Sequence, residues 1–225
     1  MDDPFPEGLR DEWARLLRVQ RPAGRDCYAD IMESPCCFPL QRAGELARMI
    51  HLAREREPRV VLEIGADKGG GLYHWVAGTR APRVAACEVR GLPYADLFEK
   101  AFPAVDFHWM PCSSRDPAAL VALREWLGRD GIDCLFLDGD KAEFLADFRT
   151  YRPLLAKAGV VFVHDITDDV PGEAFHRMEG RSKQRLIDRT DWELSKRRGG
   201  DPSCAHEAWL RHWQGRSCGV GVVYL

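Results

Sequence analysis

A glycine-rich segment and several acidic residues follow short apolar runs in this chain, and together they could hold a charged small molecule. The run at 59–65 contains Glu63 and ends in Gly65, and Gly69 and Gly70 follow before a helical stretch. Glycines at such a place let the backbone approach a ligand closely at a helix N-terminus. Glu88 ends the next apolar run, where an acid can accept hydrogen bonds from both hydroxyls of a ribose. These residues indicate a nucleoside-containing cofactor.

The spacing of the glycines argues against a dinucleotide. Three residues separate Gly65 from Gly69, so the segment lacks the G-x-G-x-x-G pattern that cradles a pyrophosphate. A nicotinamide-dependent oxidoreductase on a similar sheet is therefore a disfavoured alternative. A second alternative is a catalytically inactive, cofactor-binding interaction subunit. A glycine turn after a strand can also be purely structural, because tight turns need glycine in any case.

The elements that would position these residues alternate along the chain. Short β-branched runs at 59–65, 83–89, 106–112, 132–138 and 159–165 predict five parallel strands, and a last run at 219–225 predicts one more. Apolar residues at helical spacing lie between the runs, and Asp116-Pro117 is typical of a helix start. This alternation predicts an α/β fold with a doubly wound, mostly parallel, Rossmann-like sheet and helices on both faces. Ligands bind such sheets beyond the carboxyl ends of the strands.

Two segments are predicted to be additions to the sheet. Residues 1–38 form a prefix with one short helix at 11–20, and the domain at 39–225 carries a polar, weakly periodic insertion at about 166–218. Within that insertion, residues 177–198 include eight basic and four acidic residues, whereas the whole chain has a formal charge of −3. We expect the acceptor pocket to be built from both additions, and the basic segment to meet an anionic substrate.

Composition limits the partners and the compartment. Lys and Arg number 32 against 35 Asp and Glu, so a nucleic-acid partner is not expected. The chain has Asp2 and Asp3 where a signal peptide would be basic, and its apolar runs are too short for a membrane span. Eight cysteines without a C-x-x-C pair favour reduced thiols and a cytoplasmic protein. The expected partner is a small-molecule substrate, with a homo-oligomer as an option.

The motif Glu63-Ile64-Gly65-x-x-x-Gly69-Gly70 resembles the first motif of class I S-adenosylmethionine-dependent methyltransferases. The runs at 132–140 and 159–165 are similar to the small-molecule O-methyltransferase branch, which includes macrolide-sugar and catechol-type enzymes and the cephalosporin hydroxylase-like group. The resemblance covers roughly residues 40–170 and the last strand. It implies a seven-stranded sheet whose last strand is antiparallel, and methyl transfer from S-adenosylmethionine to a hydroxyl oxygen of a small molecule.

The resemblance also implies roles for individual residues in cofactor binding. Glu88 would bind the ribose, Ser113 or Ser114 would meet the adenine edge, and Asp138 would lie beside the sulfonium. The methionine end would be held by the loop residues Glu63, Gly65, Ala66, Gly69 and Gly70.

A metal site and a general base are implied in the same way. Asp138 and Asp165 match two metal-binding acids of relatives, and His164 stands where a third acid is commoner, which shifts the preference from Mg²⁺ towards softer divalent ions. His164 could instead orient Asp165, and both carboxylates could merely cap helices. Lys141 takes the place of a histidine base, and its ammonium must lose a proton before it can act as one.

Overall fold

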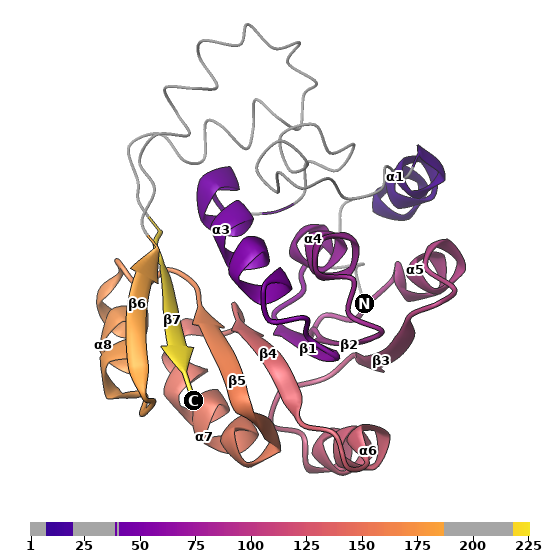
Figure 1. The fold of residues 1–225 in the computed structure, drawn as a ribbon. Coiled ribbons are helices and arrows are strands. Elements are labelled where there is room, and N and C mark those ends of the chain that lie inside the picture. Colours follow the sequence, from indigo (N-terminus) through magenta and orange to yellow (C-terminus); the bar gives the residue numbers. More distant parts are fainter. Residues whose placement is uncertain (1–7, 20–38, 40, 187–217) are drawn as a thin grey trace, which may run out of the picture.

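A seven-stranded sheet in the order β3-β2-β1-β4-β5-β7-β6 forms the centre of the computed structural model (Figure 1). The structure describes residues 8–19, 39, 41–186 and 218–225. The first five strands are parallel, and β7 runs antiparallel to both β5 and β6. The strands are β1 (Val60–Ile64), β2 (Arg83–Cys87), β3 (Asp106–Met110), β4 (Ile132–Leu137), β5 (Leu155–Val163), β6 (Ser182–Leu186) and β7 (Val220–Tyr224).

Helices cover both faces of the sheet, as predicted (Figure 1). One face carries α1 (Leu9–Leu16), α3 (Ala43–Arg54), α4 (Gly70–Thr79) and α5 (Ala95–Ala101). The other carries α6 (Pro117–Leu127), α7 (Phe144–Tyr151) and α8 (Asp169–Arg177). Short 3₁₀ turns are η1 (Leu17–Val19), η2 (Lys141–Glu143) and η3 (Arg152–Leu154).

Burial on both faces explains why the central strands are apolar runs without alternation. In β1, Val61 packs into one core, whereas Val60, Leu62 and Ile64 pack into the other. The helix at Asp116-Pro117 begins as predicted, because the Asp116 carboxylate accepts hydrogen bonds from the amides of Ala118 (2.8 Å) and Ala119 (3.1 Å). The predicted helix at 11–20 begins earlier, at Leu9, and continues into η1.

The sheet has one strand more than the sequence pattern identified. The insertion predicted at about 166–218 contributes α8 and the edge strand β6, and residues 187–217 lie outside the described part. The first four residues of β6 are exposed, so the strand carries no apolar alternation that could predict it. Its place in the sheet comes from backbone pairing with β7.

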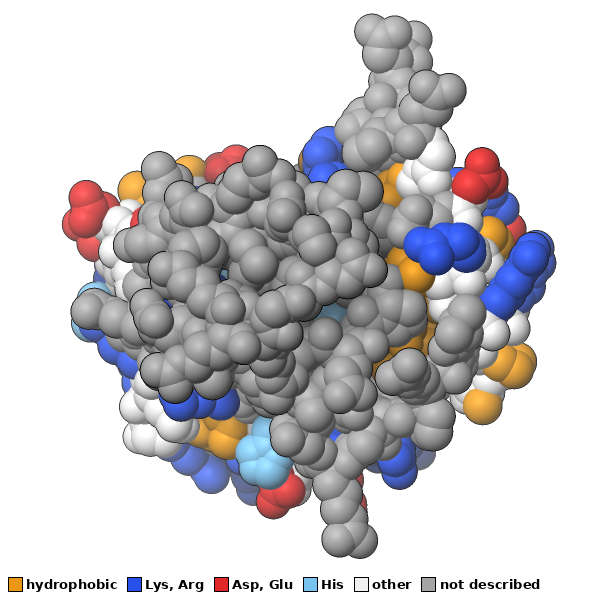
Figure 2. Space-filling view, turned by 90° about the horizontal axis from the view of Figure 1, so that it is seen from above, with side chains coloured by type: hydrophobic (Ala, Val, Ile, Leu, Met, Phe, Trp, Pro, Cys, Tyr) orange, Lys and Arg blue, Asp and Glu red, His pale blue; other side chains and the backbone are white. Residues whose placement is uncertain are grey.

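The described surface mixes both signs of charge. Seen from above, basic and acidic side chains are interspersed around the margin, with small hydrophobic areas between them (Figure 2). Within the described ranges, no helix combines the length and the apolar character that crossing a bilayer requires.

Candidate functional site

A cavity of about 970 Å³ opens at the carboxyl ends of the parallel strands. The chain winds in opposite directions on either side of β1 and β4, so the cavity lies at the switch point where ligands bind such sheets. It gathers every predicted site residue except Gly69. Those lining it are Glu63, Gly65, Ala66, Gly70, Glu88, Ser113, Ser114, Asp138, Lys141, His164 and Asp165.

The glycines of the loop after β1 are required by close approach and by backbone conformation. Gly65 has φ +89°, and a Cβ there would lie 2.5 Å from the carbonyl of Asp138 at the tip of β4. Gly69 has φ +86°, and a Cβ there would lie 2.9 Å from the ring of Tyr94. Gly69 thus turns the chain into α4 and packs away from the cavity, whereas Gly70 begins the helix and lines it.

Glu88 fixes the loop to the tip of β2. Its Oε2 accepts a hydrogen bond from the Asp67 amide (2.9 Å), and its Oε1 accepts from the Arg90 amide (3.1 Å) and the Arg90 Nε (3.2 Å). A carboxylate has about four acceptor positions and three are used here, so Oε2 keeps capacity for a ribose hydroxyl. Arg90 also pairs with Asp67, which closes the connection between the loop and β2.

Glu63 forms a buried acid at the floor of the cavity. Burial, together with the nearby Asp138 and Glu88 charges, raises the pKa of Glu63 well above its ordinary value. Its Oε2 is buried without a hydrogen-bond partner among the described atoms. A neutral carboxyl in this position can both donate to and accept from a ligand. Gly71 belongs to the same arrangement, since a Cβ there would lie 2.4 Å from Glu63 Oε1.

Asp138 and Asp165 converge on the same two cationic side chains. Lys141 Nζ lies 2.7 Å from Asp138 Oδ1 and 2.7 Å from Asp165 Oδ2. His164 Nδ1 lies 2.9 Å from Asp138 Oδ1 and 3.4 Å from Asp165 Oδ1. Gln41 Nε2 donates to the second oxygen of Asp138. Asp138 is therefore committed to side chains of the site, and the cap at the start of η2 is Asp140.

The charges in this cluster stabilise one another. Burial alone would raise the pKa of Asp138, but the charges and hydrogen bonds of His164 and Lys141 outweigh it and hold that pKa below its ordinary value. Burial would lower the pKa of His164 and of Lys141, and here Asp138 and Asp165 outweigh it and raise both values. Asp165 also has φ 56°, a left-handed conformation that is uncommon for residues other than glycine. Lys141 thus lies here as an ammonium group.

The predicted metal ligands fit a divalent ion in type and spacing. Donor atoms of Asp138, His164 and Asp165 all lie within 4.8 Å of one another. Two carboxylates with one imidazole suit a borderline divalent ion, and a metal at this place stays a prediction. The same carboxylates hold Lys141, so an ion and the ammonium group would compete for them.

The two residues predicted to meet the adenine edge differ in how many hydrogen bonds they make within the protein. Ser114 Oγ donates to Asp147 (2.8 Å), and the Ser114 carbonyl accepts a hydrogen bond from the Tyr151 hydroxyl. Ser113 is exposed and its Oγ accepts a weak hydrogen bond from the Arg115 amide at 3.4 Å. Ser113 is thus the more available of the two to a ligand.

The residues of the site that the sequence analysis did not identify include Gln41, Gly71 and Arg90. Gln41 directly precedes the helical period of α3, where nothing in the pattern marks it as polar and buried. Gly71 extends the glycine run and could have been included on that ground.

Only part of the predicted basic segment is described. Lys183 Nζ donates to the carbonyls of Phe175 and His176, and Arg185 contacts His176 Nε2. Its four described basic residues do not line the cavity. The other four lie outside the described residues, so the placement of the segment at the site stays a prediction.

The comparisons with known proteins agree with this geometry. No protein-family model matches the chain. The O-methyltransferase ankF of Aspergillus thermomutatus is 31% identical over 137 residues, which cover 57% of this chain and 53% of that protein. The chain thus spans about half the length of this curated relative.

Solved structures match over nearly the whole chain. An O-methyltransferase from Bacillus cereus in complex with S-adenosylhomocysteine has a TM-score of 0.54 at 15% identity, covering 99% of this chain and 93% of that one. TomG, an O-methyltransferase from Streptomyces achromogenes in complex with S-adenosylmethionine, has a TM-score of 0.50 at 16% identity, covering 100% of this chain and 92% of that one. The N-methyltransferase NodS from Bradyrhizobium japonicum has a TM-score of 0.51 at 12% identity, covering 97% of this chain and 98% of that one. These likenesses confirm the predicted fold and the resemblance behind it: the chain has the fold of class I S-adenosylmethionine-dependent methyltransferases.

Proposed function

We propose that this protein transfers a methyl group from S-adenosylmethionine to a small-molecule acceptor, at a hydroxyl oxygen. One observation carries the proposal: a single cavity joins the glycine loop and Glu88 to the cluster around Asp138. The first set suits a nucleoside with a charged tail, and the second suits a reacting oxygen beside a sulfonium. The curated O-methyltransferase relative and the cofactor-bound O-methyltransferase structures support the same reading.

The cofactor is proposed to lie across the tips of β1, β2 and β3. One of its ribose hydroxyls would bind Oε2 of Glu88, and its adenine edge would meet Ser113. The methionine end would lie at the start of α4, where the first amides of a helix favour a carboxylate. Glu63, whose pKa is raised by burial and whose Oε2 has no partner among the described atoms, would face the polar groups of that end.

The acceptor is proposed to lie between the methyl group and the charged cluster. An in-line transfer needs mainly positioning and a deprotonated nucleophile. Asp138 lies at the tip of β4, where its carboxylate favours the nearby sulfonium cation. If a divalent ion is bound, Asp138, His164 and Asp165 would hold it, and it would stabilise the negative charge that develops on the acceptor oxygen.

Lys141 suits the role of a charged neighbour better than that of a base. Its ammonium group is stabilised by two carboxylates at 2.7 Å, so giving up a proton to become a base is costly. As an ammonium it can donate a hydrogen bond to an acceptor oxygen and favour its ionised form. The four described cysteines, all free thiols, support placing this chemistry in the cytoplasm.

Calorimetry with S-adenosylhomocysteine tests the proposal directly. We expect saturable heat with this ligand and none with NADH, because the loop lacks a pyrophosphate cradle. Saturable heat with NADH alone would overturn the proposal in favour of the oxidoreductase. Binding of the cofactor without turnover on any hydroxyl or amine acceptor tried would favour the inactive interaction subunit.

A further inference from the structure

The outer side of the loop at 65–69 is held by two aromatic hydrogen-bond donors. Trp13 Nε1 donates to the Lys68 carbonyl at 2.6 Å, and the Tyr94 hydroxyl donates to the Asp67 carbonyl at 3.0 Å. On the inner side, the amides of Gly65 and Asp67 bond to the tip of β2. The loop is thus fixed from both sides just before α4 begins.

Trp13 comes from the N-terminal prefix, far from the loop in sequence. Its side chain is fully buried and lies against rings of α4 and α5, with centroid distances of 5.9 Å to Tyr73, 6.1 Å to Tyr94 and 5.0 Å to Phe98. In Figure 1, α1 lies beside α5 and away from the sheet. The indole therefore reaches the loop from behind, on the side opposite to the cavity that Lys68 and Gly70 line.

An ion pair anchors α1 on α5 independently of the indole. The Arg10 guanidinium binds both oxygens of Asp96, at 2.7 and 2.6 Å, and the Arg10 hydrogen bond lowers the pKa of Asp96 to about 2. Both side chains are about half exposed, so this pair orients the helix more than it stabilises the fold. The packing of α1 therefore does not depend on the Trp13 N–H group.

We propose that Trp13 is a positioning residue for cofactor binding, which acts through its indole N–H on the Lys68 carbonyl. The inference rests on the proposed function and adds to it a role for the prefix helix. Gly70 and Gly71, the first residues of α4, line the cavity, and the hydrogen bond to Lys68 fixes the loop directly before them. Without the N–H group the half-buried carbonyl would lack its partner and the loop would rearrange.

Trp13→Phe tests this, because phenylalanine keeps an aromatic ring and removes the donor. We expect affinity for S-adenosylhomocysteine, measured by calorimetry, to fall about 3- to 10-fold. Amide hydrogen exchange in residues 65–71 of the ligand-free protein should become several-fold faster. The matched control is Trp126→Phe at the opposite end of the sheet, where Nε1 is buried without a partner among the described atoms. This control should change neither quantity.

Tyr94→Phe removes the second outward donor without a change in packing volume, and it should weaken binding in the same direction. It keeps the test decisive if Trp13→Phe does not fold. If Trp13→Phe keeps the affinity and the exchange rates of the parent protein, Trp13 is only a packing residue. If Trp13→Phe does not fold, unchanged affinity and exchange in Tyr94→Phe would lead to the same conclusion. If the parent protein itself gives no heat with S-adenosylhomocysteine, the proposed function fails, and loop exchange alone decides the role of Trp13.

Discussion

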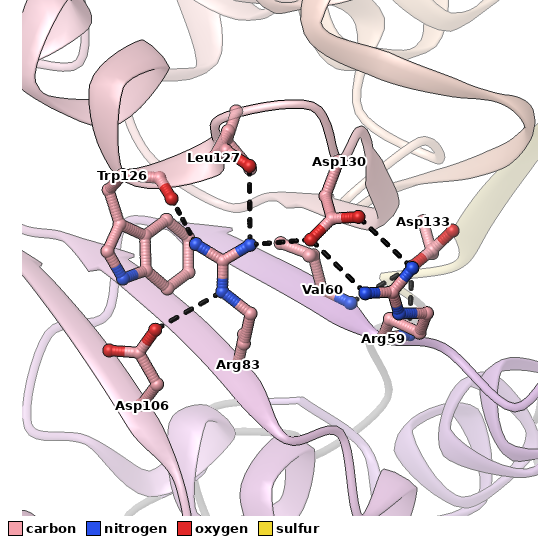
Figure 3. A network of polar contacts seen from close by, with 8 residues as sticks. All are labelled: Arg59, Val60, Arg83, Asp106, Trp126, Leu127, Asp130 and Asp133. Carbon is pink, nitrogen blue, oxygen red and sulfur yellow. Dashed lines mark hydrogen bonds and ion pairs between the residues drawn. The ribbon is translucent and has the colours of Figure 1, made fainter.

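The two ends of the parallel sheet carry similar charged residues and use them in opposite ways. At the amino end, Arg83 binds Asp106 (3.2 Å) and Asp130 (3.0 Å), and its guanidinium lies 4.1 Å from the centre of the Trp126 ring (Figure 3). Arg83 also donates to the last carbonyls of α6. Asp133 accepts hydrogen bonds from the amides of Arg59 (2.8 Å) and Val60 (2.9 Å).

At the carboxyl end, buried polar atoms are left without partners among the described residues. They are Glu63 Oε2, Gln41 Oε1 and His164 Nε2, all beside the cavity. The charged groups drawn in Figure 3 each have a partner within the protein. A charged residue by itself therefore indicates neither a stabilising contact nor a functional site. Charged groups that are satisfied within the fold stabilise it, and the unsatisfied polar groups that line the cavity are available to a ligand.

The largest expected effect at either end is that of Asp138→Asn on turnover. The neutral amide keeps the shape but loses the charge that faces the sulfonium and the metal-ligand function. We expect kcat to fall at least about 100-fold, with affinity for S-adenosylhomocysteine retained within several-fold. Steady-state kinetics with calorimetry measure both. Asp133→Asn is the matched control at the amino end, and a comparable loss of turnover there would remove the distinction between the ends.

Removal of divalent ions by a chelator should affect the activity, which depends on the carboxyl end of the sheet, and leave the stability of the fold nearly unchanged. If Asp138, His164 and Asp165 hold a divalent ion during turnover, exhaustive chelation abolishes the activity and a borderline ion restores it. The free energy of unfolding in chelator should stay within about 0.5 kcal/mol of its value without it, because Lys141 and His164 already balance the carboxylates. Full activity in chelator would show that the reaction needs no divalent ion.

Glu88→Ala should weaken cofactor binding by about 1.5 to 3 kcal/mol, or roughly 10- to 150-fold. The substitution removes the charged acceptor for the ribose and the partner of the Asp67 amide. Isothermal titration with S-adenosylhomocysteine gives the value. Asp106→Ala, which removes an acid from the opposite end of the neighbouring strand, should leave affinity unchanged, and an equal loss there would argue that Glu88 acts only through stability.

Arg83→Ala should lower the free energy of unfolding by about 2 kcal/mol, because it leaves Asp106, Asp130 and two helix carbonyls with fewer partners. Urea unfolding measures the loss. Affinity for S-adenosylhomocysteine at a temperature where the variant is folded should be that of the parent. Arg59→Ala, whose side chain is mostly exposed, should cost less than about 1 kcal/mol, and a cost equal to that of Arg83→Ala would contradict this account of the network.

Glu63→Gln should stabilise the protein by about 0.5 to 2 kcal/mol at neutral pH. The pKa of Glu63 in the folded state lies above its ordinary value of 4.5, so the folded state keeps a proton that the unfolded state releases. Stability that depends on Glu63 is therefore lost as pH rises from 4.5 towards the raised pKa. Urea unfolding of both proteins from pH 5 to pH 8 should show a difference that grows with pH, whereas a constant difference would exclude ionisation of Glu63 as its cause.

Strand tips could be predicted from the sequence, whereas contacts between distant segments could not. Glu63 lies near the end of an apolar run, Glu88, Asp138 and Asp165 each lie at the end of one, and parallel strands bring such ends together. Trp13 belongs to a helix whose apolar period gives its buried face but not the loop that it contacts, and Gln41 precedes α3, where no period marks its contact with Asp138. The edge strand β6 lacks any apolar period, because only its last residue, Leu186, is buried.

The insertion of β7 between β5 and β6 sets an order on the folding of this sheet (Figure 1). Because β6 pairs only with β7 in the described sheet, it has no place there until the later segment has entered beside β5. During synthesis, β5 would therefore present an open edge while α8 and β6 wait, and such edges are where chains pair wrongly with one another. Changes that slow the entry of β7 should thus show first as aggregation of the nascent protein, before any loss of stability in the finished one.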